Sequence, residues 1–212
     1  MPSSDQGANP PVGLIRAQRW GRAVALGLTG LRAALAPALV ACGIAHAGGL
    51  AAAALVAGFV SDVFDGVVAR RFGVSTAGLR RFDSITDIAF YLAALFCAWC
   101  LQPQVLRAYA TWIALVVGTL ILDHLVERWK LGRVASYHAW TAKLWGLTLF
   151  AALVLLFARG SGTLVPLAIA CGLLSNLEDF AITLVLPAWR HDVPSVVHAW
   201  RIRVESSRRP AA

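Results

Sequence analysis

The sequence predicts an all-α integral membrane protein, built as a bundle of six transmembrane helices, and three observations lead to this prediction. Hydrophobic residues make up 58% of the 212 residues, whereas charged residues make up only 14%. The mean hydropathy of +0.68 is higher than that of an ordinary soluble domain. The apolar residues also gather into six runs, each close to the roughly 20 residues with which a helix crosses a bilayer.

The N-terminal residues are polar and lead toward the first span. Residues 1–13 contain proline, glycine and polar side chains, which predicts a disordered tail. The next segment has Trp20 among Arg16, Arg19 and Arg22, and this combination is typical of the lipid headgroup region. An N-terminal interfacial segment is therefore expected, with a soluble linker as the alternative.

Six apolar spans follow this segment. They are predicted at residues 24–44, 50–70, 79–101, 106–126, 137–158 and 164–186. The second span is rich in alanine, and such small residues let membrane helices approach one another closely. With the interfacial segment, the spans are expected to form one transmembrane domain over residues 14–187, which Pro187 closes.

The C-terminal residues 188–212 are predicted to be a basic interfacial tail on the cytoplasmic side. Four apolar residues in it recur at helical spacing, namely Val196, Val197, Trp200 and Val204. Several arginines accompany them. A C-terminal amphipathic segment that lies on the membrane surface is therefore expected.

The basic residues predict the orientation in the membrane. With the N-terminus inside, the outer segments hold only Arg107 and Arg159. The inner segments then hold fifteen basic residues: Arg16, Arg19, Arg22, Arg70, Arg71, Arg80, Arg81, Arg128, Lys130, Arg133, Arg190, Arg201, Arg203, Arg208 and Arg209. Since Lys and Arg accumulate in cytoplasmic loops, both termini are expected in the cytoplasm. The same rule accounts for the net charge of +8, and no nucleic-acid partner is expected.

Four aspartates lie within or beside the apolar runs: Asp62, Asp65, Asp83 and Asp87. A charged side chain at the centre of a membrane helix costs roughly 3 kcal/mol on insertion scales. Such residues are tolerated where they face a polar cavity, pair with one another or bind a cation. Asp62 and Asp65 are three residues apart, and Asp83 and Asp87 are four apart, so each pair shares one face of a helix.

The segment between the two pairs predicts a hairpin. Gly73 and Gly78 are expected to break the helix there. At 1.5 Å per residue, both aspartate pairs then lie at a matching depth of about 7 to 14 Å from the break. Four converging carboxylates repel one another unless a cation neutralises them, and their oxygen ligands suit Mg²⁺ or Mn²⁺. Four carboxylates could hold two ions, the arrangement that clamps phosphoryl oxygens during displacement.

The residues around the four aspartates resemble the CDP-alcohol phosphatidyltransferases, whose pattern is D-x2-D-G-x2-A-R-x8-G-x3-D-x3-D. Seven of its eight positions are in register here: Asp62, Asp65, Gly66, Ala69, Arg70, Asp83 and Asp87. The departure is Leu79, which stands where the family has its second glycine, while Gly78 stands one place earlier. This departure affects the backbone expected at the nucleotide pocket and moves no carboxylate.

The resemblance implies a divalent-metal-dependent enzyme with residues 14–187 as its catalytic domain. Such an enzyme transfers a phosphatidyl group from a CDP-linked lipid, such as CDP-diacylglycerol, to the hydroxyl of a small alcohol and releases CMP, in phospholipid biosynthesis. The resemblance implies two Mg²⁺ or Mn²⁺ ions held by Asp62, Asp65 and Asp83 with help from Asp87, and it makes Asp87 the catalytic base. It also implies a homodimer in the cell membrane, and the predicted orientation places the active site on the cytoplasmic side.

The acceptor alcohol stays open among serine, inositol phosphate, choline and glycerol phosphate. The glycerophosphate branch of the family commonly has proline after the third aspartate and lysine after the fourth. Ser84 and Ile88 stand at those places here, which makes this stretch more similar to the serine-accepting branch.

Six residues are candidates for binding the substrate or its nucleotide: Arg32, Gly66, Ala69, Arg70, Gly78 and Lys143. Gly66 would allow a ligand to approach the backbone closely, and Arg70 would bind phosphate through its fork of donors. The structural alternatives are helix packing for Gly66 and a loop anchor for Arg70. Arg32 and Lys143 lie inside predicted spans, where a basic residue is expensive unless it is paired, faces a cavity or snorkels. In the family, basic residues on neighbouring helices line the pocket for the acceptor or the lipid phosphate.

Three alternatives remain for the four aspartates. They could form structural ion pairs with Arg70, Arg71, Arg80 and Arg81. They could belong to a membrane cation or proton transporter, which also places acids in membrane helices. They could persist in an inactive family member that acts as a scaffold, a possibility that Leu79 keeps open.

Further polar residues are interpreted as structural. A charge cluster at a helix end is expected from Asp123, His124, Glu127 and Arg128, and Asp179 is expected to pair with a base inside the membrane. Cys97 and Cys100 form a CxxC pair, but it lies within an apolar span and no second pair exists, so these two and Cys42 and Cys171 are interpreted as small apolar packing residues.

Overall fold

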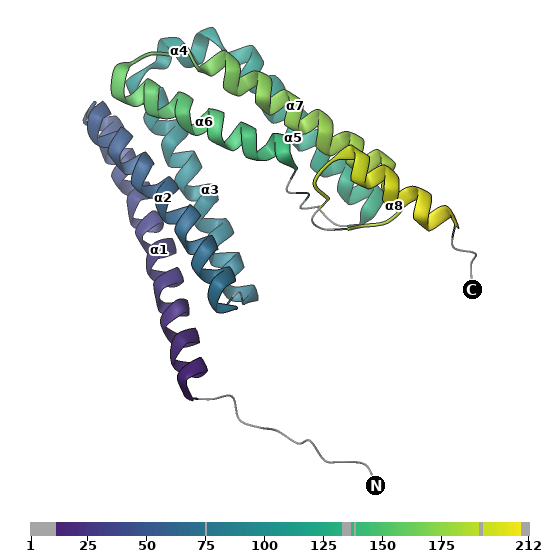
Figure 1. Cartoon of the computed structure of the whole chain (residues 1–212). Helices are drawn as coiled ribbons and strands as arrows, with labels where there is room; N and C mark the ends of the chain where they lie inside the picture. The colour runs from purple at the N-terminus through teal and green to yellow at the C-terminus, as the bar shows by residue number, and fades with distance from the viewer. Residues whose placement is uncertain (1–11, 75, 133–136, 138, 191–192, 209–212) are drawn as a thin grey trace. The chain divides into compact units, whose positions relative to one another are not determined.

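The computed structural model describes residues 12–74, 76–132, 137, 139–190 and 193–208. All regular secondary structure in these residues is helical, which confirms the predicted all-α class (Figure 1). Six helical segments are long and apolar enough to cross a membrane: Gln18–Ile44, Gly48–Phe72, Arg81–Leu101, Ala110–Leu131, Trp140–Arg159 and Val165–Val185. They correspond in order to the six predicted spans.

The chain packs as two compact units, Met1–Leu101 and Gln102–Ala212, and each is described by itself. The predicted disordered tail lies outside the described residues as far as residue 11. Val12 and Gly13, which were assigned to that tail, already belong to the first helix. The predicted interfacial segment is part of the same helix, so it continues into the first span without a break.

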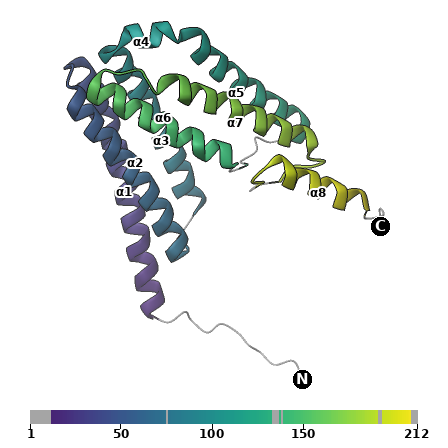
Figure 2. The ribbon, with the colours of Figure 1, turned by 45° about the horizontal axis from the view of Figure 1, so that its top comes forward.

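The first unit consists of α1 (Val12–Ile44), α2 (Gly48–Phe72) and α3 (Ala77–Leu101). α1 packs along both α2 and α3, as both ribbon views show (Figures 1 and 2). Glycine permits a close contact between α1 and α3: a Cβ added at Gly43 would lie 2.9 Å from the Cα of Cys97. Small residues at helix crossings therefore bring α1 and α3 together, as they do in other membrane bundles.

The second unit consists of α4 (Pro103–Ala108), α5 (Ala110–Leu131), α6 (Trp140–Arg159), α7 (Val165–Val185) and α8 (Val196–Arg208). α7 is its centre, because it packs against α5, α6 and α8. The short helix α4 was not predicted, and the fourth span begins at Ala110 rather than at residue 106. Tyr109 separates the two helices with a φ of −106° and a ψ of 10°, so the apolar run is longer than the helix that crosses.

The turn between α2 and α3 differs from the predicted one at its second glycine. Gly73 follows α2 with a φ of +61°, a conformation that favours glycine, and it ends that helix. Gly78, by contrast, lies inside the first turn of α3 and is not among the glycines of positive φ in the described residues. α3 starts earlier because Thr76 caps it: the amide of Leu79 donates to Thr76 Oγ1 at 3.2 Å.

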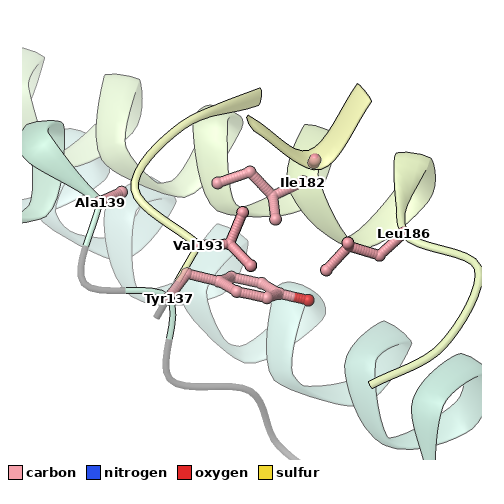
Figure 3. Close-up of a cluster of buried hydrophobic side chains, with 6 residues drawn as sticks. Tyr137, Ala139, Ile182, Leu186 and Val193 are labelled. Atoms are coloured by element: carbon pink, nitrogen blue, oxygen red, sulfur yellow. The ribbon is translucent and has the colours of Figure 1, made fainter. Parts of the chain in front are cut away.

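A small apolar core lies in the second unit at the C-terminal end of α7 (Figure 3). It consists of Tyr137, Ala139, Ile182, Leu186, Val193 and Ala199, and α8 packs onto it. α8 forms where the amphipathic helix was expected, but its packed face carries Val196, Ala199 and Ile202. Val197 and Trp200, which were assigned to the apolar stripe, are 60% and 59% exposed.

Candidate active site

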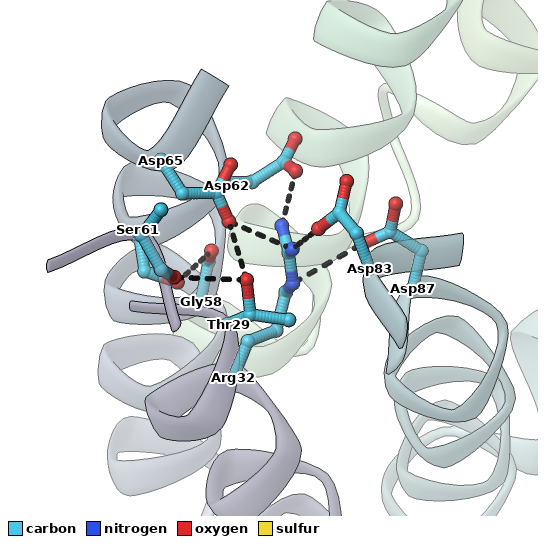
Figure 4. Close-up of polar contacts among 9 residues, drawn as sticks. Thr29, Arg32, Gly58, Ser61, Asp62, Asp65, Asp83 and Asp87 are labelled. Atoms are coloured by element: carbon cyan, nitrogen blue, oxygen red, sulfur yellow. Dashed lines mark hydrogen bonds and ion pairs between the residues drawn. The ribbon is translucent and has the colours of Figure 1, made fainter. Parts of the chain in front are cut away.

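The hairpin of α2 and α3 brings the four aspartates together, as their spacing predicted (Figure 4). Asp62 and Asp65 come from one face of α2, and Asp83 and Asp87 come from one face of α3. Asp62, Asp83 and Asp87 each present a carboxylate oxygen, and these three oxygens all lie within 4.8 Å of one another. We refer to the four residues as the aspartate cluster.

A single arginine from α1 lies at the centre of the aspartate cluster. Arg32 is only 2% exposed, and its guanidinium forms ion pairs with all four aspartates. Its Nη1 bonds to Asp62, and its Nη2 bonds to Asp83 and, at 3.0 Å, to Asp65. Its Nε lies 3.1 Å from Asp87 Oδ1 without hydrogen-bond geometry. The planar fork of five N–H donors lets one side chain reach four carboxylates.

The four aspartates differ in their access to ligands. The side chains of Asp62, Asp83 and Asp87 are 43%, 36% and 34% exposed, whereas that of Asp65 is 8% exposed. Asp65 instead faces α1, where Thr29 Oγ1 lies 3.3 Å from its Oδ2. The cluster therefore has a closed side at Asp65 and an accessible side formed by the other three carboxylates.

Thr29 is a site residue that sequence reasoning missed. Thr29 is 1% exposed, and its hydroxyl also donates to the carbonyl oxygen of Ala25, one turn earlier in α1, at 3.0 Å. The available signal was its position three residues before Arg32, which puts both polar side chains on one face of an apolar helix. Ser61, although adjacent to Asp62, donates its hydroxyl to the carbonyl of Gly58 at 2.7 Å.

The donor set fits a divalent cation. All ligand atoms are carboxylate oxygens, which hard cations such as Mg²⁺ and Mn²⁺ prefer. One guanidinium does not balance four carboxylates, so the cluster retains an excess of negative charge. The guanidinium of Arg32 also shows that the carboxylates can surround a positive charge at this place.

Comparison with known protein families agrees with this geometry. The family model for CDP-alcohol phosphatidyltransferase matches residues 22–192, which include the aspartate cluster and five of the six spans completely. The chain belongs to the CDP-alcohol phosphatidyltransferase family. A search of curated proteins and a search of solved structures each found no match.

Membership of the CDP-alcohol phosphatidyltransferase family makes the protein one of a class of transferases that act on CDP-alcohols. The family generally uses divalent metals, and the aspartate cluster provides the oxygen ligands for them. The six apolar helices of this chain indicate a multi-pass membrane protein.

The other predicted substrate-binding residues lie in different places. Gly66 is one helical turn from Arg70, and a Cβ added at Gly66 would lie 3.4 Å from Arg70 Nη1. Gly78 is exposed, and a Cβ there would meet nothing within 4 Å. Ala69 is part of α2, but its side chain lies outside the described part of the chain. Lys143 belongs to the second unit, where its exposed ammonium lies 4.5 Å from the centroid of the Trp140 ring.

One alternative paired the four aspartates with the arginines near the turn between α2 and α3, and the described ion pairs differ from it. Arg70, Arg71 and Arg81 are exposed. Among the residues described, none of these three pairs with an aspartate of the cluster, and Arg32 provides the positive charge instead. The side chain of Arg80 lies outside the described residues.

A second acidic cluster lies between α5 and α7 in the second unit. Asp123 and Glu127, expected at a charged helix end, are 3% and 2% exposed because they face α7. Asp123 Oδ1 and Asp179 Oδ1 are buried without a hydrogen-bond partner in the described chain. The base that was expected to pair with Asp179 is likewise not found among the described ion pairs, and His124 pairs with Glu127 at 3.3 Å.

Proposed function

We propose that the protein transfers a phosphatidyl group from a CDP-linked lipid, with CDP-diacylglycerol as the donor, to the hydroxyl of a small alcohol. One observation carries the proposal: the aspartates that match the family motif converge from α2 and α3 within helices apolar enough to span a membrane. A membrane enzyme of this kind can take a lipid donor from the bilayer and a polar acceptor from water, and join them where the two phases meet.

Asp62, Asp65, Asp83 and Asp87 would hold two divalent ions, Mg²⁺ or Mn²⁺. When bound, these ions neutralise the pyrophosphate of the donor and stabilise charge on the departing CMP. The three accessible carboxylates face the substrate side, whereas Asp65 is held against α1 by Thr29 and Arg32. This difference in burial supports a rigid inner ligand and three outer ligands that substrates can approach.

In this proposal Asp87 accepts the proton of the acceptor hydroxyl. The oxygen of that hydroxyl attacks the lipid-bearing phosphorus, a new P–O bond forms, and the bond from that phosphorus to the oxygen of CMP breaks. Asp87 suits the role because its side chain is 34% exposed, so an acceptor can come within hydrogen-bond reach. In the membrane, the apolar helices around the cluster would limit the access of water, which would favour transfer over hydrolysis.

The proposal assigns nucleotide and phosphate binding to the residues next to the cluster. Gly66 and Arg70 lie on α2 one turn apart, so a phosphate could contact the guanidinium beside a backbone that has no side chain in the way. Ala69, Gly78 and Lys143 remain candidates for the same pocket. The resemblance to the family also supports a homodimer, and the distribution of basic residues supports an active site on the cytoplasmic side.

The decisive experiment is incubation of the purified protein with labelled CDP-diacylglycerol, Mn²⁺ or Mg²⁺ and a panel of alcohols. Serine, inositol phosphate, glycerol phosphate and choline form the panel, and the readouts are CMP and the lipid product. We expect CMP release that requires both a divalent ion and one of the alcohols. Asp83→Asn is expected to reduce turnover by orders of magnitude while the protein stays folded.

Two results would count against the proposal. Near-normal turnover of Asp83→Asn in the presence of a divalent ion would exclude the role given to the aspartate cluster. Folded wild-type protein that releases no CMP with any alcohol would favour the scaffold alternative, and metal or proton flux in vesicles without CMP release would favour a transporter.

A further inference from the structure

Arg32 occupies a position that the proposed function does not explain. Its guanidinium lies among the side chains that the proposal assigns to the divalent ions, and it contacts Oδ1 of Asp62, Asp83 and Asp87. These are the three residues whose carboxylate oxygens lie within 4.8 Å of one another. A divalent ion bound by this group would therefore share the three carboxylates with the guanidinium.

Two cations cannot share these carboxylates without repelling each other. Arg32 is buried and remains charged in proteins, so it cannot relieve the repulsion by losing its proton. It can relieve it by moving, because an arginine side chain has several rotatable bonds. After such a movement the guanidinium can keep its ion pair with Asp65. This residue lies outside the group of three, and Thr29 on α1 donates a hydrogen bond to it.

We propose that Arg32 is the resident counter-cation of the aspartate cluster and that a divalent ion binds by exchange with it. On exchange, the guanidinium leaves Asp62, Asp83 and Asp87 and keeps its contact with Asp65. Arg32 thus has two effects as a positioning residue. It holds the carboxylates together when no ion is bound, and it lowers the affinity for the ion by competing for the same carboxylates. The inference rests on the proposed function through its metal site.

The choice of arginine supports this role. A lysine ammonium is a compact charge with three donors on a flexible stem, whereas the guanidinium is a planar fork with five. Only the guanidinium is wide enough to contact the aspartates of α2 and those of α3 at the same time. Arg32→Lys is therefore expected to hold the cluster less well than the native residue, although it keeps the charge.

The test measures Mn²⁺ binding rather than turnover, using electron paramagnetic resonance of free Mn²⁺ on the full-length protein in detergent. Removal of the competing charge in Arg32→Gln is expected to lower the Kd for Mn²⁺ by at least about tenfold, because a charge–charge interaction at such short range is strong even at an effective dielectric constant near 20. In EDTA, the same variant is expected to unfold at a lower temperature than the wild type, and saturating Mn²⁺ should restore most of the loss.

Arg71→Gln is the matched control, because it removes one positive charge from an exposed site on α2 outside the cluster. Its Kd for Mn²⁺ is expected to stay close to that of the wild type. An Arg32→Gln variant that binds Mn²⁺ with the wild-type Kd, or more weakly, overturns the inference.

A second measurement does not depend on the folding of Arg32→Gln. In wild-type protein with ¹⁵N-labelled arginine, the Nε signal of Arg32 is identified by its loss in Arg32→Lys. It should shift on addition of Mg²⁺, and a signal that stays unchanged at Mg²⁺ concentrations that displace Mn²⁺ overturns the exchange. If Mn²⁺ binding is abolished by Asp83→Asn but unaffected by Arg32→Gln, only this inference fails. If the wild type binds no Mn²⁺, the metal site of the proposed function fails with it.

Discussion

The buried acids of the first cluster are paired with an arginine, whereas in the second cluster Asp123 Oδ1 and Asp179 Oδ1 have no hydrogen-bond partner among the described residues. The four aspartates of the first unit surround Arg32, whereas the acids between α5 and α7 face one another. Asp123 lies close enough to Glu127 and Asp179 to interact electrostatically with both. A buried carboxylate oxygen without a partner costs about 1–3 kcal/mol, and like charges add to that cost. These acids therefore lower the stability of the second unit.

The first prediction at the residue scale is that Asp123→Asn stabilises the protein. The amide is uncharged and can donate a hydrogen bond to the neighbouring acids, so the repulsion falls. A gain of about 1 kcal/mol corresponds to a rise in unfolding temperature of about 2–4 °C for a chain of this size. Thermal unfolding in detergent measures it, and Glu205→Gln, at an exposed position on α8, is the control. A lower unfolding temperature for Asp123→Asn would contradict the argument.

The sequence allowed the aspartate cluster to be predicted but not its central cation. Asp62, Asp65, Asp83 and Asp87 lie on two helices joined by a short turn, so spacing alone determines that they meet. Arg32 reaches them from α1, and its contact depends on how α1 is shifted along α2 and α3. That shift is decided by side-chain packing between helices, which a single sequence does not reveal. The burial of Asp123 was missed for the same reason.

At the scale of helices, the geometry of the site depends on how closely α2 approaches α3. Gly58 on α2 faces Phe90 on α3, and a Cβ added at Gly58 would lie 2.2 Å from Phe90 Cζ. Phe90 is 3% exposed, so its ring has little room to move. Asp62 follows Gly58 by one helical turn, and Asp87 precedes Phe90 by a similar distance. The contact between glycine and phenylalanine therefore sets the separation of the two aspartate pairs.

Gly58→Val is predicted to disturb the site from outside it. The added side chain must push α3 away from α2, and overpacking of this kind typically costs about 1–3 kcal/mol. Both the unfolding temperature and the affinity for Mn²⁺ should fall. Gly27→Val on α1 is the control, because a Cβ at Gly27 meets nothing within 4 Å. Wild-type Mn²⁺ affinity in Gly58→Val would show that the contact does not position the aspartates.

The ends of helices were predicted less well than their centres. Apolar runs marked all six spans, yet α3 begins at Ala77 rather than at residue 79, and α5 begins at Ala110 rather than at residue 106. A cap decides the boundary at α3: Thr76 Oγ1 accepts a hydrogen bond from the amide of Leu79, and Gly73 rather than Gly78 has the positive φ. These are local contacts of single polar groups, which hydropathy does not detect.

At the scale of the whole molecule, the order of the spans connects the site to one side of the membrane. If successive spans cross in alternate directions, as the basic residues predict, the turn between α2 and α3 is expected on the cytoplasmic side. That side receives fifteen basic residues, whereas the opposite side receives Arg107 and Arg159. A cytoplasmic location would give the aspartate cluster access to nucleotide-activated donors, which are made in the cytoplasm.

Reporter fusions test this orientation along the whole chain. Fusions after Arg71 and Ala211 are expected to report the cytoplasm, because basic residues near span ends are retained on that side. Fusions after His46 and Pro103 are expected to report the outside, since the segments near them carry few basic residues. The double variant Arg70→Glu/Arg71→Glu tests whether basic residues determine the orientation, because it reverses two charges at the turn without shortening a span. An external signal from the Arg71 fusion would be incompatible with a cytoplasmic active site, since the aspartate pairs lie on the two helices that this turn joins.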